Sequence, residues 1–63
     1  MGMTLEQDIR YIDRCANRVG AGLGLHAYHI NNLYFIQKRL EANSQAPQEY
    51  VELAKNLQHN KLW

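Results

Sequence analysis

Three arginines and two asparagines give this 63-residue chain its clearest capacity for specific binding. Arg10, Arg14 and Arg18 follow one another four residues apart, so a helix would place them in one row. Such a row is either a solvated helix face or a ridge that contacts nucleic-acid phosphates. Asn31 and Asn32 lie further along the chain, and an asparagine can pair through two hydrogen bonds with adenine. These side chains make double-stranded DNA one candidate partner.

His26 and His29 are the residues with the spacing closest to that of metal ligands, three positions apart on one helix. Two histidines are too few for a metal site, and neither a carboxylate nor a cysteine is in register with them. The "GAGLG" segment lacks the spacing of a phosphate-binding glycine loop and follows no strand. Cys15 falls within a helical pattern, which favours a buried thiol over a reactive one. We therefore expect no enzymatic activity, no cofactor and no metal.

The length and charge of the chain limit the classes of protein to which it could belong. A chain of 63 residues forms one small domain, here residues 1–63, and buries only about 60% of its unfolded surface. Its net charge of +1 is too small for a polybasic tail. Residues 19–36 form the most apolar window, but its histidines and asparagines exclude a membrane span. A lone cysteine and the absence of a signal-peptide pattern predict a cytoplasmic protein.

The first predicted helix begins with a capping box. Thr4 is a good N-cap, and Gln7 follows it by the three residues that the box requires. The helix then carries one apolar stripe with steps of four and three residues. The stripe comprises Leu5, Ile9, Ile12, Ala16, Val19 and Leu23.

Two further helices complete an all-α fold of three main helices in a compact bundle, or of four if the first stripe is interrupted near Cys15. Gly24 is the expected left-handed turn residue. A second apolar stripe runs from Leu25 to Leu40, and that helix should end near Ala42 or Asn43. The "NSQAP" segment is a loop by composition, and Pro47 suits the first position of the third helix.

A helix-turn-helix would explain why glycines separate two good helices. Val19 and Gly20 would be the apolar and small pair at a close helix crossing, with Leu23 the last core residue before a turn at Gly24. The start of the second helix would then face DNA. The outward residues there are His26, Ala27, Tyr28, Asn31 and Asn32.

At these positions the sequence resembles the helix-turn-helix domains of the LuxR/GerE type. "LGLHAYHI" is similar to the turn and the start of that family's recognition helix, and "LYFIQKRL" to the stretch that closes it. "YVELAKNL" corresponds to the last helix, which usually makes the dimer contact. The resemblance implies a dimeric, DNA-binding transcriptional regulator. Arg10, Arg14, Arg18 and Lys38 would contact DNA together with the outward residues of the second helix.

The predicted homodimer would use the third helix, whose apolar face is larger than one short helix needs. The expected interface residues are Tyr50, Val51, Leu53, Ala54 and Leu57, with Leu62 and Trp63 as a further contribution.

A second interpretation is a small helical interaction module without a nucleic-acid role. The glycines would allow an α-hairpin, and the partner would be a helical protein or a second copy. Tyr28, Tyr34 and Phe35 would then anchor the interface, because aromatic residues dominate such contacts. The geometry around Gly24 separates the two interpretations, since a helix-turn-helix crosses at about 90–120° whereas a hairpin is nearly antiparallel.

Overall fold

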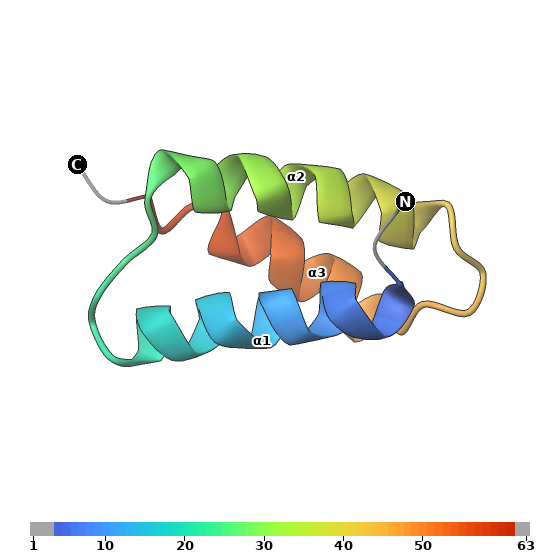
Figure 1. Cartoon of the computed structure of the whole chain (residues 1–63), viewed down its shortest axis with the longest axis horizontal. Coiled ribbons are helices and arrows are strands. Elements are labelled where there is room, and N and C mark those ends of the chain that lie inside the picture. Colours follow the sequence, from blue (N-terminus) through green and yellow to red (C-terminus); the bar gives the residue numbers. More distant parts are fainter. Residues whose placement is uncertain (1–3, 62–63) are drawn as a thin grey trace.

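Three helices make up the computed structural model, which describes residues 4–61 (Figure 1). They are α1 (Leu5–Gly20), α2 (Ala27–Glu41) and α3 (Gln48–Leu57), and the described residues contain no strand. The all-α prediction of three helices is confirmed. Because α1 passes Cys15 without a break, the four-helix alternative does not occur. The predicted contribution of Leu62 and Trp63 lies outside the described residues.

Local signals determine where α1 begins and ends. The Thr4 hydroxyl accepts a hydrogen bond from the Gln7 amide and the Gln7 side chain accepts one from the Thr4 amide, both at 3.1 Å, so the capping box is confirmed. At the other end, the Gly22 N–H donates to the Val19 carbonyl (2.9 Å) and the Leu23 N–H donates to the Arg18 carbonyl (3.0 Å). This is the Schellman pattern, and the φ of Gly22, +79°, supplies its left-handed residue.

The prediction that Leu23 ends the core stripe is wrong. Because α1 already stops at Gly20, Leu23 lies in the connection to α2 and keeps 52% of its surface exposed. The expected close crossing at Gly20 is also wrong, because a methyl group added there would meet nothing within 4 Å. The left-handed conformation predicted for Gly24 is confirmed by its φ of +71°. Leu25 then enters the core, and its N–H donates to the Asn60 carbonyl (3.0 Å).

The two long helices run in opposite directions, and α3 packs against both of them (Figure 1). Their side chains pair in antiparallel order. Asp8, in the first turn of α1, binds Arg39, near the end of α2, through Nη2–Oδ1 (2.8 Å) and Nε–Oδ2 (3.0 Å) contacts. Asn32, closer to the middle of α2, donates through its amide to the hydroxyl of Tyr11 (2.8 Å). The helices on either side of Gly24 therefore form an α-hairpin.

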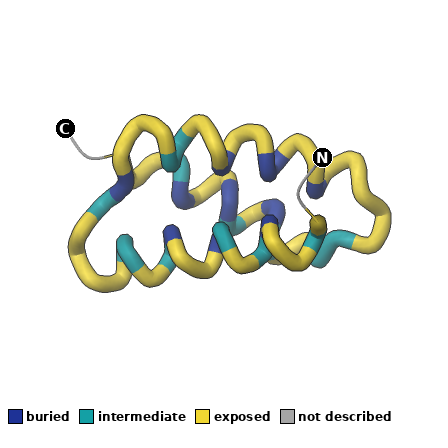
Figure 2. The backbone as a smooth tube through the Cα atoms, in the orientation of Figure 1, coloured by how far each residue is buried: buried dark blue, intermediate teal, exposed yellow. Residues whose placement is uncertain are grey.

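The apolar core lies where the three helices meet (Figure 2). Its buried members are Ile12, Cys15, Leu25, Leu33, Ile36, Leu40, Val51, Ala54 and Leu57. Asp8 is also buried, with 2% of its surface exposed, and its carboxylate accepts two hydrogen bonds from Arg39.

The core also corrects the predicted dimer interface. Val51, Ala54 and Leu57 are covered by the chain's own α1 and α2 and expose at most 5% of their surface, so they cannot meet a second copy in this fold. The apolar face of α3 is large because it packs against two helices and not one. Tyr50 and Leu53 remain half-buried at the edge of α3, and the Tyr50 hydroxyl donates to Asp13 (3.3 Å).

Candidate functional site

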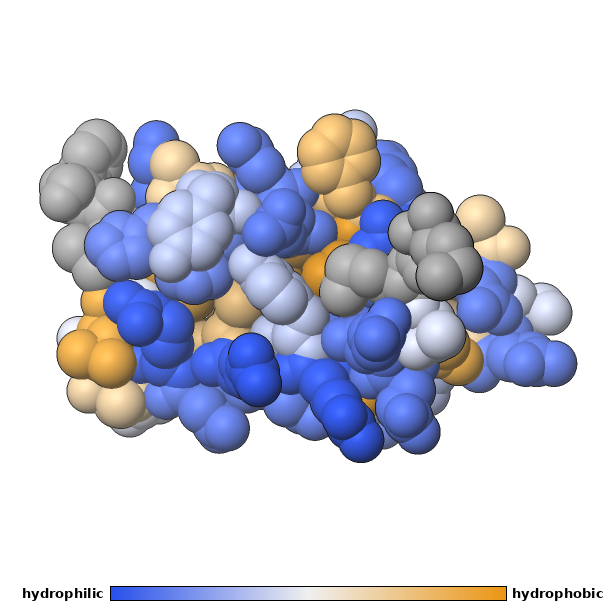
Figure 3. All heavy atoms as spheres, viewed as in Figure 1, coloured by the Kyte–Doolittle hydropathy of each residue, from blue (hydrophilic) through white to orange (hydrophobic). Residues whose placement is uncertain are grey.

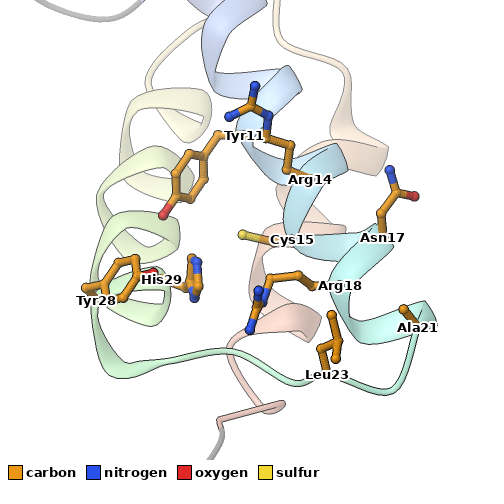
Figure 4. Close-up of a pocket in the computed structure, with 9 residues that line it drawn as sticks. All are labelled: Tyr11, Arg14, Cys15, Asn17, Arg18, Ala21, Leu23, Tyr28 and His29. Carbon is orange, nitrogen blue, oxygen red and sulfur yellow. The ribbon is translucent and has the colours of Figure 1, made fainter.

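A groove of about 510 Å³ opens between the second half of α1 and the start of α2 (Figure 4). The groove forms because α1 and α2 make few direct contacts with each other. Both helices pack mainly against α3 instead. Its walls combine aromatic, apolar and basic side chains. The lining residues are Tyr11, Arg14, Cys15, Asn17, Arg18, Ala21, Leu23, Tyr28 and His29.

Cys15 lies between the walls of the groove, with its sulfur directed toward α2 (Figure 4). The residue exposes only 2% of its surface. Burial raises the pKa of the Cys15 thiol, and the nearby charge of Arg18 opposes this increase only in part. The thiol is therefore protonated at neutral pH and packs as a small apolar group, in agreement with the buried thiol predicted from the sequence.

Two arginines give the groove its basic character. Both Arg14 and Arg18 extend from α1 toward the α2 side (Figure 4). The Arg18 Nε donates to the Gly24 carbonyl (3.0 Å), which fixes that side chain against the connection. Within residues 4–61, Arg14 makes neither an ion pair nor a hydrogen bond through its side chain. No described residue therefore competes with an anionic group for the Arg14 guanidinium.

The opposite wall is aromatic and is organised by His29. The rings of Tyr28 and His29 lie with their centroids 4.2 Å apart, and that of Tyr11 lies 6.4 Å from His29. The His29 Nδ1 accepts a hydrogen bond from the backbone N–H of His26 (3.0 Å), which caps the start of α2. Burial lowers the pKa of His29, and electrostatic interactions with Arg18 and with the neighbouring imidazole of His26 lower it further. His29 is therefore neutral at pH 7 and keeps its capping role.

The histidines do not form a metal centre with other residues. His29 already uses its Nδ1 as a hydrogen-bond acceptor, and His26 stacks its ring against Tyr28 at 5.6 Å. Among the residues that the structure describes, no three histidine, cysteine or carboxylate side chains come together to hold an ion.

A smaller hollow of about 260 Å³ continues the seam toward the other end of the helices. It shares Tyr11 with the first hollow and is lined by Tyr11, Asn32, Phe35, Ile36 and Arg39. We call the two together the α1–α2 groove. The most exposed of its large apolar and aromatic side chains are Leu23 (52%), Tyr28 (60%) and Phe35 (60%). In the space-filling view, a band of strongly hydrophilic side chains follows α1, while paler and orange side chains lie over the α1–α2 connection and over α2 (Figure 3).

The predicted DNA-contacting residues are only partly brought together. Arg14, Arg18 and Tyr28 meet in the larger hollow of the groove, and Asn32 lines the smaller one. Arg10 lies further along the same edge of α1 and is 3.9 Å from Glu6, with both side chains largely exposed.

The remaining residues of the predicted recognition surface are dispersed over α2. His26, Ala27 and Asn31 are exposed, whereas the Asn32 amide is bonded to Tyr11. Lys38 lies over the ring of Tyr34 (5.3 Å to the centroid) and pairs with Glu41 (3.6 Å), away from the groove.

Two features at and beside the groove were not identified from the sequence, the pairing of Asp8 with Arg39 and the exposure of Leu23. The pairing of Asp8 with Arg39 had a usable signal, because Asp8 lies at helical spacing between Leu5 and Ile12 and a carboxylate on an apolar stripe needs a partner. Leu23 gave no such signal, since its assignment to the core followed from a helix that continues past Gly20.

Comparisons with known proteins do not assign the chain to a family. No protein-family model, no curated protein and no solved structure matches the chain. The resemblance to LuxR/GerE domains stays a prediction from the sequence. None of the helices within residues 4–61 has the length and hydrophobicity that a transmembrane segment needs.

Proposed function

We propose that the chain is a protein-interaction module that binds an amphipathic helix of its partner in the α1–α2 groove. The observation that carries the proposal is the antiparallel pairing of α1 and α2, which leaves an open aromatic and apolar seam between them. Leu23, Tyr28 and Phe35 each expose more than half of their surface along it. Contiguous exposed apolar surface marks interaction sites in soluble proteins, because burying it stabilises a complex.

The shape of the groove favours a helix over other partner conformations. The groove follows two antiparallel helices, and α2 with its 15 residues is about 22 Å long. A third helix in such a seam would pack as helices do in bundles, with its side chains between those of α1 and α2. A partner helix of about four turns would present apolar residues at i, i+3, i+4 and i+7 to this seam.

DNA binding is the second candidate, and the arginine row on α1 is the observation in its favour. Arg10, Arg14 and Arg18 lie along one edge of the helix, where they could contact phosphates. Protein binding is better supported for two reasons. The amide of Asn32 and the Nε of Arg18 already have partners within the chain. The α1–α2 pair is also antiparallel, whereas a recognition helix crosses its predecessor steeply.

A displayed library of amphipathic helical peptides tests the proposal. The library is selected on the wild-type protein, and the enriched peptides are then measured against Phe35→Ala and Tyr34→Ala. Phe35 lines the groove, while Tyr34 is a neighbouring exposed aromatic residue that does not. We expect Phe35→Ala to weaken binding about tenfold or more, as loss of an interface anchor does, and Tyr34→Ala to change it by less than about threefold.

Two results would contradict the proposal. One is a selection that enriches no peptide over a blank surface. The other is a set of peptides that bind Phe35→Ala as tightly as the wild type. A parallel selection with a randomised DNA duplex pool at low salt measures the second candidate, and enrichment there alone would favour DNA binding.

A further inference from the structure

The charges that surround the α1–α2 groove indicate the chemistry of the helix that it takes. Resting on the proposed function, we infer that the partner helix is acidic, with glutamates or aspartates beside its apolar stripe that pair with Arg14 and Arg18. The apolar stripe itself covers Leu23, Tyr28 and Phe35.

Arg14 is the main basis of this inference. Its side chain lines the groove, extends toward α2 and makes no ion pair or hydrogen bond within residues 4–61 (Figure 4). A guanidinium can bind a carboxylate through two parallel hydrogen bonds, which gives both strength and orientation. A carboxylate of the bound helix could therefore pair with Arg14 without displacing any described residue from its guanidinium.

Arg18 supplies a second, pre-oriented positive charge. Its Nε is held by the Gly24 carbonyl at 3.0 Å, and its two terminal nitrogens make no hydrogen bond with the other described residues. The side chain is half-buried, so part of its conformational freedom is already lost before a partner arrives. A binding group that is fixed in advance loses less entropy on association.

The groove also lacks compensating negative charge. Among the described residues that line the two hollows there is no aspartate or glutamate, although the net charge of the whole chain is only +1. The carboxylate nearest in the fold to Arg39 is that of Asp8, which is buried and bound to it. The groove is thus positive on a nearly neutral molecule, which favours an acidic partner and hastens its encounter.

The apolar part of the groove favours a protein partner over a nucleic acid. A duplex offers phosphates to Arg14 and Arg18 but no apolar side chains to cover Leu23 and Phe35. An acidic amphipathic helix matches both parts of the groove at once.

Three synthetic peptides of about 18 residues, long enough for a helix that spans the groove, test this inference. All carry the same leucine stripe, and the flanking positions carry glutamate in one, glutamine in the second and lysine in the third. Binding to the full chain is measured by fluorescence anisotropy at low and at high salt. We expect the glutamate peptide to bind about tenfold more tightly than the glutamine peptide, the lysine peptide to bind most weakly, and the difference to shrink as salt rises.

Matched variants locate the effect. Arg14→Gln should weaken the glutamate peptide about fivefold and leave the glutamine peptide within about twofold. Lys55→Gln removes the same charge from α3, outside the groove, and should change neither peptide. Arg14→Lys keeps the charge and should recover part of the loss.

The outcomes separate this inference from the proposed function. If the glutamate and glutamine peptides bind equally well, the acidic partner is refuted while docking in the groove stands. If no peptide binds, both are refuted. A random-sequence duplex provides the third outcome. If the duplex displaces the glutamate peptide, and Arg14→Gln abolishes binding of the duplex, the partner is a nucleic acid and the inference is overturned.

Discussion

Replacing Arg39 with alanine should destabilise the protein more than removing the charge of its partner through Asp8→Asn. Arg39 provides both hydrogen bonds to the Asp8 carboxylate, at 2.8 and 3.0 Å. The two side chains differ in exposure, with 43% for Arg39 and 3% for Asp8. Loss of Arg39 therefore leaves a buried, unpaired carboxylate, whereas loss of the carboxylate leaves a guanidinium that water can reach.

The exposed fractions of the two side chains determine how much stability each substitution should cost. Breaking a fully buried ion pair costs about 3–5 kcal/mol, while an exposed pair contributes about 0.2–1 kcal/mol. Because 43% of the Arg39 side chain is exposed while Asp8 is buried, we expect Arg39→Ala to cost about 2–3 kcal/mol. Asp8→Asn keeps an acceptor oxygen for Arg39 and should cost about 1 kcal/mol. In the Asp8→Asn background, Arg39→Ala should add only about 1 kcal/mol, since no buried charge remains.

Urea denaturation followed by circular dichroism measures these differences in the free energy of unfolding. A chain of this size has only about 3–5 kcal/mol of stability, so Arg39→Lys, which keeps the charge, serves as a milder variant with an expected cost of about 1 kcal/mol. The reasoning is refuted if Arg39→Ala costs less than about 1 kcal/mol, or if its cost is the same with and without the Asp8 carboxylate.

Three further predictions concern the connection between the long helices. Gly20→Ala should stabilise the protein by about 0.5–1 kcal/mol, because the added methyl group meets open space at the end of α1; a loss of stability in the same urea titration would contradict this. Gly24→Val should cost more than about 1 kcal/mol, because a β-branched residue is strained at a φ of +71°; an unchanged thermal melt would show that the turn is not needed. His29 should make stability pH-dependent. Its pKa in the folded protein lies below the ordinary 6.5, so the unfolded chain binds more protons between the two values. Stability should therefore fall as the pH decreases from about 6.5 through the folded pKa, and His29→Gln, which can still accept the capping hydrogen bond from His26, should remove this slope. Equal slopes in the wild type and the variant would refute the role of His29.

Local chemistry explains which parts of the fold could be predicted. The capping box of Thr4 and Gln7 and the left-handed Gly24 depend on neighbouring residues alone, so the sequence is sufficient to identify them. Periodicity likewise identified three helices. The end of α1 was missed because Gly22 and Gly24 can both terminate a helix, and only the hydrogen bonds of the folded chain show that Gly22 does so.

Packing partners could not be predicted from periodicity. An apolar face on α3 shows that something covers it, but not whether the cover is a second copy or the rest of the chain. Val51, Ala54 and Leu57 were therefore assigned to a dimer although α1 and α2 bury them. The direction of α2 relative to α1 depends on the path through two left-handed glycines, which residue spacing does not specify.

The candidate site was predictable only in its residue types. The basic row with Arg14 and Arg18 and the exposed aromatic residues Tyr28 and Phe35 were recognised as binding groups. Their union in one groove depends on the antiparallel hairpin, which brings α1 and the start of α2 side by side. The hydrogen bond from Asn32 to Tyr11 spans 21 positions in sequence and had no local signal.

Amide chemical shifts of the isotope-labelled protein, titrated with the glutamate-flanked amphipathic peptide, test docking in the α1–α2 groove most directly. We expect the largest changes at groove residues of both helices, including Tyr11, Arg14, Tyr28 and Phe35. Little change is expected around Tyr50 on α3. Shifts confined to α3, or no shifts at saturating peptide, would contradict docking in the groove.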